Sequence, residues 1–161
     1  MQTFLPYPGF YDSVRCLDNK RLGKQRVEAL QILKALYIPD YGWRHHPCVK
    51  MWSGYTQALE MYMDICIEEW IKRGFKNTMK RANPQCYVDT KMPHWIGNEK
   101  LHYSHKSNLL RKDGEFYSQY KWKVNSITEY YWCGYSKKER EAAKNGQSKS
   151  VSYTHLRAHE T

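Results

Sequence analysis

Residues 17–33 read LDNKRLGKQRVEALQIL, and the rest of the predicted fold is built outward from them. Polar residues recur there at intervals of three and four, which places them on one face of a helix: Arg21, Lys24, Gln25 and Glu28. Apolar residues fall mostly on the other side of the helix, and this pattern continues just past the quoted stretch: Leu22, Ala29, Leu30, Leu33 and Leu36. The stretch predicts an amphipathic helix from Asp18 to a point before Pro39, with Asp18 or Asn19 as its N-cap.

The polar face of this helix is strongly basic. Residues 15–26 hold five basic residues and one acid, in a chain of 161 residues with a formal net charge of +10. Basic charge gathered in one segment favours a nucleic acid partner, and a solvated helix face is the alternative. Glu28 is the lone carboxylate inside this basic strip, which indicates chemistry on the bound polyanion. Gly23 indicates either a close approach of a backbone or ligand, or a helix that starts one turn later.

The composition is that of one domain long enough to bury a core. Aromatic residues make up 15% of the chain, with fourteen Tyr and six Trp, which suit cores and also stack on bases. The five cysteines lack CxxC spacing and follow no secretory signal, so we expect reduced thiols in a cytosolic protein: Cys16, Cys48, Cys66, Cys86 and Cys133. No apolar stretch approaches the roughly 20 residues of a membrane span, so no membrane partner is expected.

The N-terminal segment, residues 1–11, reads MQTFLPYPGFY and carries no charged side chain. Its Pro6, Pro8 and Gly9 break any regular element. We expect this apolar arm to pack on the helices and so to fix the α-amino group of Met1.

Two more helices complete the predicted core. One runs from Pro47 to Arg73, a rod of roughly 39 Å at 1.5 Å per residue, and a long connection over 75–93 follows it. Its inward stripe repeats every three or four residues: Val49, Trp52, Thr56, Leu59, Met63, Cys66 and Trp70. The other lies within His94–Lys112, capped at Asn98 and stopped near Gly114, with a thin core face: Leu101, His105, Asn108 and Leu109.

Two histidine-containing segments carry candidate site residues. In the third helix, His102 and His105 lie near Lys106, Arg111 and Lys112, a second basic surface. Either histidine suits acid–base chemistry, and a packed or solvated histidine is the alternative.

In the loop before Pro47, a cluster holds Arg44, His45 and His46 beside Trp43, with Cys48 after it. A metal site would need further ligands at a matching spacing, and none stands out, so contacts of this loop with DNA or an ordinary helix entry are favoured. A metal-dependent nuclease using His45, His46 and nearby carboxylates is the weakest alternative.

The C-terminal part divides in two. Residues 116–135 interleave aromatic residues with lysines such as Lys121, beside Trp122, which fits an element gripping a nucleic acid strand or a segment that covers the helices with its rings. From Ser136 the chain turns polar, with a short exposed helix expected over 137–144. The last stretch, SVSYTHLRAHET, resembles translated adapter or vector sequence and is set aside. We therefore expect one helical domain over 1–135 and a polar tail over 136–161.

Three stretches together resemble the phage-type pyrimidine-dimer DNA glycosylases, the endonuclease V-like family. LDNKRLGKQRVEAL, residues 17–30, is similar to the family's first helix, in which a catalytic Glu follows basic contacts. HPCVKMWSGYTQALEMYMDICIEEWIKRGFKN, residues 46–77, is similar to its long second helix. MPHWIGNEKLHYSHKSNLLRKDGEFY, residues 92–117, resembles its third-helix region. The resemblance covers about residues 1–132 and extends to a bacterial and phage subgroup.

The resemblance implies an all-α, compact single domain of three main helices with long connecting loops and the N-terminal arm packed on them. It implies a DNA glycosylase with apurinic-site lyase activity, acting without a cofactor. The N-terminal α-amine attacks C1′, displaces the base and forms an imine, and β-elimination then cuts the strand. An α-amine, with a pKa of about 7.7–8.0, is partly neutral and nucleophilic at pH 7.

By the same resemblance, Glu28 stabilises the positive charge on the sugar and assists proton transfers. We expect Lys24 and Arg21 to favour its ionised form. Two departures from the family stand out. Gln2 should block removal of Met1, so the nucleophile would be the amine of Met1 itself. Arg21 replaces a family histidine, which keeps phosphate contact but leaves the lesion specificity open.

The expected partner is damaged double-stranded DNA, bound by a monomer in the cytoplasm of a bacterial or phage-infected cell, near the nucleoid. The expected catalytic residues are Met1 and Glu28, and no metal is expected. The expected DNA contacts are Lys20, Arg21, Lys24, Gln25, Arg26, Arg44, His45, His102, His105, Arg111, Lys112, Lys121 and Trp122. The alternative is a non-catalytic helical nucleic-acid-binding protein that keeps the basic face without the chemistry.

Overall fold

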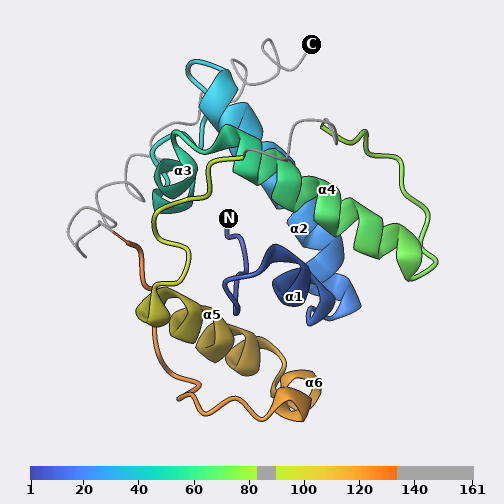
Figure 1. The fold of residues 1–161 in the computed structure, drawn as a ribbon, viewed down its shortest axis with the longest axis vertical. Helices are drawn as coiled ribbons and strands as arrows, with labels where there is room; N and C mark the ends of the chain where they lie inside the picture. The colour runs from blue at the N-terminus through green and yellow to red at the C-terminus, as the bar shows by residue number, and fades with distance from the viewer. Residues whose placement is uncertain (83–89, 134–161) are drawn as a thin grey trace.

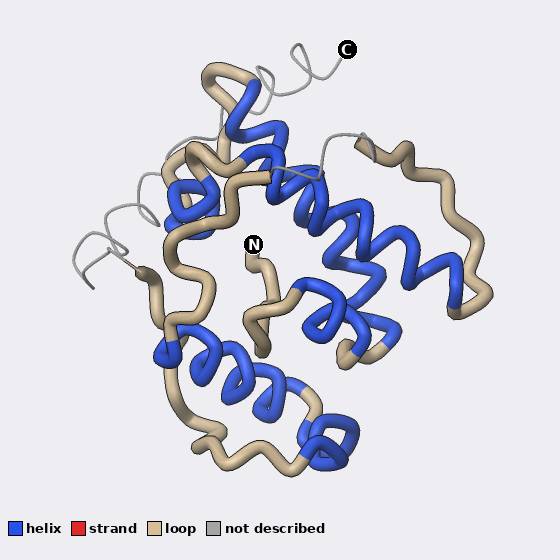
Figure 2. The backbone as a smooth tube through the Cα atoms, in the orientation of Figure 1, coloured by secondary structure: helices blue, strands red, loops and turns tan. Residues whose placement is uncertain are grey.

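The computed structural model describes residues 1–82 and 90–133, and within these ranges it contains helices and loops but no strand (Figures 1 and 2). The elements are α1 (Phe10–Arg15), α2 (Asn19–Tyr37), α3 (Pro47–Trp52), α4 (Thr56–Lys72), α5 (Glu99–Lys112), α6 (Gly114–Tyr117) and the 3-10 helix η2 (Ser118–Tyr120). The predicted all-α fold is confirmed. The tail over 136–161, including the helix expected over 137–144, lies outside the described residues.

Helix α2 follows the predicted amphipathic pattern and packs along α4 (Figure 1). The contact depends on Gly23, because a Cβ at this position would lie 3.0 Å from Cζ3 of Trp70 on α4. Since α2 begins at Asn19, before Gly23, the alternative of a later start is wrong. The close approach is real, and the neighbour is an aromatic ring.

The predicted rod from Pro47 to Arg73 is wrong in one respect, because two helices stand in its place. The break lies between Trp52 and Thr56, where Gly54 has φ +85°, a left-handed conformation that glycine adopts at little cost. Figure 1 shows α3 at an angle to α4 as a result. The predicted stop is confirmed, since α4 ends at Lys72 and Gly74 has φ +93°.

The N-terminal arm passes through the middle of the fold, between α1, α3 and α5 (Figure 1). Phe4 and Leu5 are 5% and 0% exposed, which confirms that the arm packs on the helices. Helix α1 was not predicted, because Pro6, Pro8 and Gly9 hid a short helix that begins right after them. Its signal was the pair of buried apolar residues four apart, Phe10 and Val14.

Helix α5 confirms the third predicted helix from its cap onward. The Asn98 side chain accepts a hydrogen bond from Leu101 N–H at 3.2 Å, and the helix ends at Lys112 before α6 begins. The predicted core face is buried: Leu101, His105, Asn108 and Leu109. The described parts of the long connection, 75–82 and 90–93, contain no helix.

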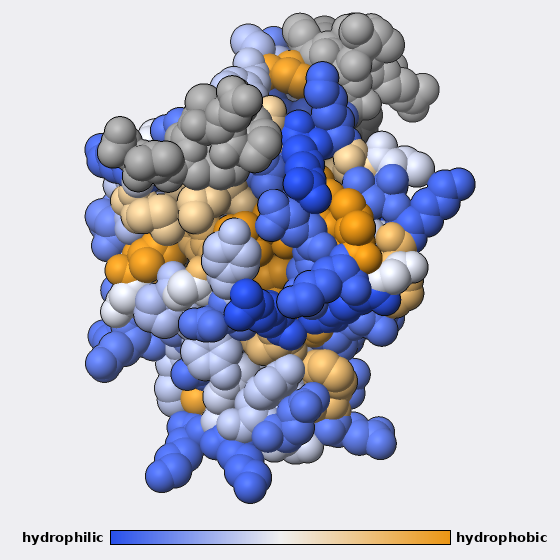
Figure 3. All heavy atoms as spheres, turned by 45° about the vertical axis from the view of Figure 1, so that its right-hand side comes forward, coloured by the Kyte–Doolittle hydropathy of each residue, from blue (hydrophilic) through white to orange (hydrophobic). Residues whose placement is uncertain are grey.

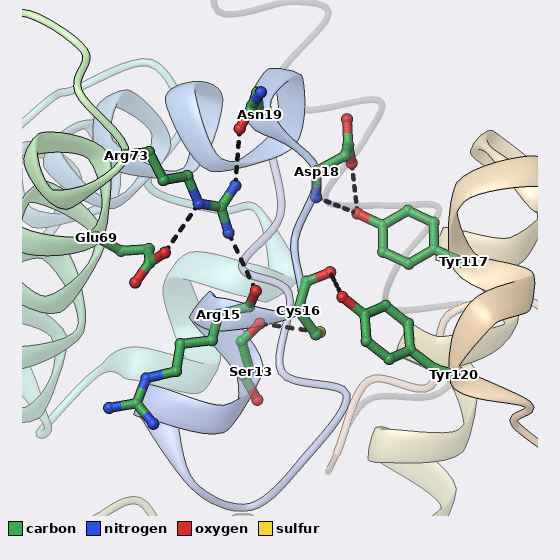
Figure 4. A network of polar contacts seen from close by, with 9 residues as sticks. All are labelled: Ser13, Arg15, Cys16, Asp18, Asn19, Glu69, Arg73, Tyr117 and Tyr120. Carbon is green, nitrogen blue, oxygen red and sulfur yellow. Dashed lines mark hydrogen bonds and ion pairs between the residues drawn. The ribbon is translucent and has the colours of Figure 1, made fainter.

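The turn between α1 and α2 is held from two sides by hydrogen bonds that we call the turn network (Figure 4). From α4, Arg73 donates to Arg15 O at 3.1 Å and to Asn19 Oδ1 at 3.0 Å. Its Nε also donates to Glu69 at 2.9 Å.

On the other side of the turn, the partners come from α6 and η2. The Tyr117 hydroxyl accepts from Asp18 N–H at 3.0 Å and donates to Asp18 Oδ1. The Tyr120 hydroxyl donates to Cys16 O at 2.9 Å. Asp18 therefore occupies the N-cap position of α2, as predicted, but its carboxylate bonds to Tyr117 and Arg21 and makes no capping hydrogen bond.

The face of the molecule drawn in Figure 3 is predominantly polar. Figure 3 shows one face, on which hydrophilic side chains surround small apolar patches. Among the described helices, none combines the length and apolar character needed to cross a membrane.

Candidate active site

A cleft of about 520 Å³ opens beside the N-terminus, between the polar face of α2 and the loop before α3. Its lining is Met1, Gln2, Phe4, Lys20, Arg21, Lys24, Gln25, Glu28, Trp43, His46, Pro47, Lys112, Tyr130 and Trp132. The structure thus brings both predicted catalytic residues, Met1 and Glu28, into one cleft. Four predicted cationic DNA contacts join them there: Lys20, Arg21, Lys24 and Lys112.

Glu28 is half-buried at the cleft, and its electrostatics differ from the expectation. Burial raises the pKa of Glu28 above its ordinary value. The positive charge of the Met1 α-amine, the backbone N–H of Gln2, and then Lys24 and Lys112 act in the opposite direction. Lys24 therefore favours the ionised form as expected, but burial is the largest of these effects and gives the net shift the opposite direction.

Arg21, the other cation expected to act on Glu28, is engaged elsewhere. Its guanidinium lies 3.3 Å from Asp18 in an ion pair three residues back along α2. Arg21 still lines the cleft, so its remaining donors face the same space as Met1.

The arm is held in place by hydrogen bonds that we call the arm network, and Gln25 is its first part. Gln25 is 0% exposed. Its Nε2 donates to Gln2 O and to Glu28 Oε2, both at 2.9 Å. Its Oε1 accepts from Phe4 N–H at 2.9 Å and from the Tyr62 hydroxyl at 2.5 Å.

Two histidines of α5 form the second part of the arm network by holding both backbone groups of Leu5. His105 Nδ1 accepts from Leu5 N–H at 2.9 Å. His102 Nε2 accepts from Gly97 N–H at 2.9 Å, so the proton of this neutral ring sits on Nδ1, which lies 2.7 Å from Leu5 O. Burial lowers the pKa of both rings, that of His105 to about 3.

Gln25, His102 and His105, which were predicted to contact DNA, are buried, and each makes at least one hydrogen bond to the N-terminal arm instead. The packed-histidine alternative is the one that holds, and acid–base chemistry by these rings with substrate is excluded by the same burial.

Aromatic rings form one side of the cleft, and the sequence interpretation missed most of them. Neighbouring ring centroids are 5.6 to 6.2 Å apart along a series from the arm to the loop before α3: Phe4, Tyr130, Trp132, His46 and Trp43. The available signal was the aromatic content of residues 116–135 and of the loop with Trp43. Nothing in the spacing indicates that these two segments meet.

His46 is a neutral member of this ring series. Its Nδ1 accepts from Cys48 N–H at 3.0 Å and caps α3, so its Nε2 carries the proton. Burial and then the Met1 α-amine lower the pKa of His46 to about 4. Across residues 1–82 and 90–133, no group of three or more His, Cys, Asp or Glu side chains is arranged to hold a metal ion.

Three other predicted contacts, Arg26, Lys121 and Trp122, do not line the cleft. Arg26, two residues before Glu28, points to the opposite side of α2, where its guanidinium stacks over Trp70 at 4.3 Å and donates to Asn77. Trp122 stacks on Tyr117 and Tyr120 and donates to the Tyr7 hydroxyl at 2.8 Å.

The segment after α6 thus covers the helices with its rings at Trp122, as the packing alternative has it, and Lys121 beside it is exposed but does not line the cleft. Three exposed residues remain available next to cleft-lining neighbours. They are Arg44 and His45, which precede His46, and Arg111, which precedes Lys112.

The cleft thus combines an amine, a carboxylate, stacking surfaces and a basic rim. A neutral amine is a nucleophile, and a carboxylate whose pKa is raised by burial exchanges protons more readily at mild pH. Rings stack on bases, and the cations Lys20, Lys24 and Lys112 attract phosphates.

Comparison with known families gives one match. A family model described as pyrimidine dimer DNA glycosylase matches residues 1–83, the segment that holds the arm and helices α1 to α4. No curated protein and no solved structure matches the chain.

Proposed function

Because the chain belongs to the pyrimidine dimer DNA glycosylase family and is thereby a DNA-repair glycosylase, we propose that it excises a pyrimidine dimer or related lesion through an imine on Met1. In the same reaction it cuts the strand at the resulting abasic site. The observation that carries this proposal is that the Met1 amine and Glu28 lie in one cleft.

The chemistry begins with the neutral α-amine of Met1. Its lone pair forms a bond to C1′, the bond from C1′ to the base breaks, and the base leaves with that electron pair and a proton. Glu28 takes the remaining amine proton and returns it to O4′ as the bond from C1′ to O4′ breaks, which opens the sugar ring and leaves an imine. Removal of a 2′ proton then expels the 3′ phosphate by β-elimination, which cuts the strand, and water finally releases the product from the amine.

Glu28 acts on the charge and the protons of these steps. As a carboxylate it stabilises the positive charge that develops at the sugar, and it accepts the protons that the amine loses. Because burial raises its pKa, Glu28 is better suited to proton transfer than a solvent-exposed carboxylate with an ordinary pKa would be.

The surroundings of the cleft hold the DNA. We assign phosphate contacts to the cations that line it, Lys20, Arg21, Lys24 and Lys112, and to the exposed neighbours Arg44, His45 and Arg111. Tyr130 and Trp132 offer a face on which an extruded base can stack, which offsets part of the few kcal/mol that unstacking costs.

Borohydride trapping on duplex DNA with an abasic site, or with ultraviolet lesions, tests this function. We expect a covalent adduct that peptide mass spectrometry maps to the α-amine of Met1. Acetylation of the N-terminus should abolish the adduct. No adduct together with salt-sensitive DNA binding would instead identify the non-catalytic alternative, and cutting that a chelator abolishes would identify a metal-dependent nuclease.

Substitution of the carboxylate tests the second half of the pair. Glu28→Gln should lower single-turnover strand cutting by about 100-fold or more and leave DNA affinity unchanged. Glu99→Gln, an exposed position at the start of α5, is the matched control and should cut at the parental rate. Equal cutting by Glu28→Gln and the parent would contradict the mechanism.

A further inference from the structure

Gln25 joins the N-terminal arm to the predicted carboxylate. Its side chain is fully buried, and its amide makes four hydrogen bonds: from Phe4 N–H and Tyr62 to the oxygen, and from the nitrogen to Gln2 O and Glu28. A carboxamide has two acceptor lone pairs and two N–H donors, so this side chain is fully used.

The partners leave the amide one orientation. Phe4 N–H can only donate, so only the oxygen of Gln25 can face it, and the Tyr62 hydroxyl, which also donates to Phe4 O at 3.0 Å, lies at the same oxygen. The nitrogen is then directed at two acceptors, Gln2 O and Glu28 Oε2, each at 2.9 Å. A flipped amide would set its nitrogen against Phe4 N–H and its oxygen against both acceptors, Gln2 O and Glu28.

We infer that Gln25 is the positioning residue that sets the separation between the Met1 α-amine and the Glu28 carboxylate. The inference rests on the proposed function, since the separation matters only if these two groups act together. Gln2 is linked to Met1 by a single peptide bond, so a fixed Gln2 carbonyl leaves the amine little room. The other hydrogen of the same nitrogen fixes one oxygen of Glu28.

The charges around Glu28 make the neutrality of Gln25 important. The charged groups that face Glu28 are the Met1 amine, Lys24 of α2 and Lys112 of α5. The other titratable groups coupled to it are uncharged at neutral pH: Cys48 of α3, Tyr62 of α4 and Tyr130. A carboxamide at position 25 holds Glu28 without adding a charge to this set.

The variant Gln25→Glu separates positioning from simple packing. It keeps the length of the side chain and the acceptor for Phe4 N–H, but it replaces the donor to Glu28 with a second carboxylate. The second carboxylate repels Glu28 where the amide attracted it, and we expect the single-turnover rate of adduct formation at pH 7.5 to fall about 100-fold. At lower pH the pair shares one proton, which restores a donor, so the ratio of variant to parental rate should rise as pH falls toward 5.5.

Two further variants complete the experiment. Gln31→Glu adds the same charge to α2 outside the cleft, and its rate relative to the parent should be close to one at every pH. Gln25→Met keeps the size and removes all four hydrogen bonds. Its rate should fall at every pH while the dissociation constant for abasic DNA stays within about twofold of the parental value.

The possible outcomes are distinct. A variant-to-parent ratio for Gln25→Glu that does not change with pH, or parental rates in both Gln25 variants, would overturn the positioning role alone. If the parent forms no adduct at Met1 at any pH, the proposed function itself is wrong, and the role of Gln25 falls with it.

Discussion

The arm network and the turn network both hold the N-terminal part of the chain, but they end on different kinds of group. In the arm network, Gln25, His102 and His105 bond to backbone atoms of the arm, and one bond continues to Glu28 in the cleft. In the turn network, Arg73 and Tyr117 bond to the turn before α2, and the bond that continues to the cleft runs from Asp18 to Arg21, a proposed phosphate contact and neither of the two proposed catalytic groups.

This difference teaches that a buried hydrogen bond near an active site need not serve it. Breaking either network leaves buried polar groups unpaired and so costs stability. Only the arm network controls where the Met1 amine lies relative to Glu28. Activity measured below the unfolding temperature should therefore separate the two networks, while stability should not.

Among the variants that test this comparison of the two networks, the largest effect is expected at His105. His105→Phe leaves Leu5 N–H buried without a partner, which should cost about 2 kcal/mol of stability. The loosened arm should also slow adduct formation by between about 10- and 100-fold. The rate should be measured by borohydride trapping at a temperature where the variant is folded. His105→Asn, whose Oδ1 can replace the acceptor, should recover most of the rate, and an unrecovered rate would argue against the hydrogen bond as the cause.

The turn network should behave in the opposite way. Tyr117→Phe removes the hydroxyl that bonds to Asp18, which is 8% exposed, and should cost about 2 kcal/mol in urea unfolding. Its rate of adduct formation should stay within about twofold of the parent. Tyr11→Phe, on an exposed ring of α1, is the control and should change neither quantity. A slow but stable Tyr117→Phe protein would erase the distinction between the networks.

The histidines predict how stability depends on pH. The pKa is about 3 for His105 and about 4 for His46, and that of His102 is lowered, against about 6.5 in an unfolded chain. Between these values the unfolded chain binds more protons, so stability should fall as pH drops below about 6.5. The raised pKa of Glu28 acts the other way, but as one group against three. Melting temperatures from pH 7 to pH 4 check this, and His105→Asn should give a shallower decline.

The smallest effect is expected where α2 meets α4. Gly23→Ala would place a Cβ 3.0 Å from the Trp70 ring, which is itself stacked on Phe75 at 4.2 Å and covered by Arg26. Overpacking costs about 1–3 kcal/mol and the helix gains about 1 kcal/mol from losing a glycine, so we expect a net loss of about 1 kcal/mol. Gly114→Ala, with nothing within 4 Å of the new Cβ, should not destabilise the protein in the same urea titration.

The parts of the fold and site that could be predicted from the sequence are those that depend on the helical repeat of the side chains. Spacing of three and four residues placed Arg21, Lys24 and Glu28 on one face, and the cleft is built on that face. The same spacing puts Arg26, two residues from Glu28, on the other side of the helix, but the prediction grouped it with the DNA contacts by its charge. A count of basic residues does not distinguish an exposed cation from one stacked on a ring, and the periodicity does.

The rest depended on contacts that have no local signal. Leu5 and its partner His105 are 100 positions apart, and a histidine has the same sequence pattern whether it packs or reacts. Gln25 has the spacing of a cleft residue and lines the cleft, yet it is 0% exposed and bonds to the arm. Gly54 is one glycine in an otherwise continuous helical pattern, and only its backbone conformation shows that the helix ends there.

The hydrogen bonds of the two histidines to Leu5 fix the position of Leu5, and they also fix how many residues lie between Leu5 and the α-amine. Both backbone groups of Leu5 are bound, and the next residue, Pro6, has no N–H, so a shift that puts Pro6 in the place of Leu5 would lose the bond to His105. Four residues separate this anchor from the α-amine. An extended residue spans about 3.3 Å, more than the length of a hydrogen bond, so one residue inserted or deleted ahead of Leu5 would carry the amine out of reach of Glu28. The length of the arm is thus as much a part of the site as any side chain in it.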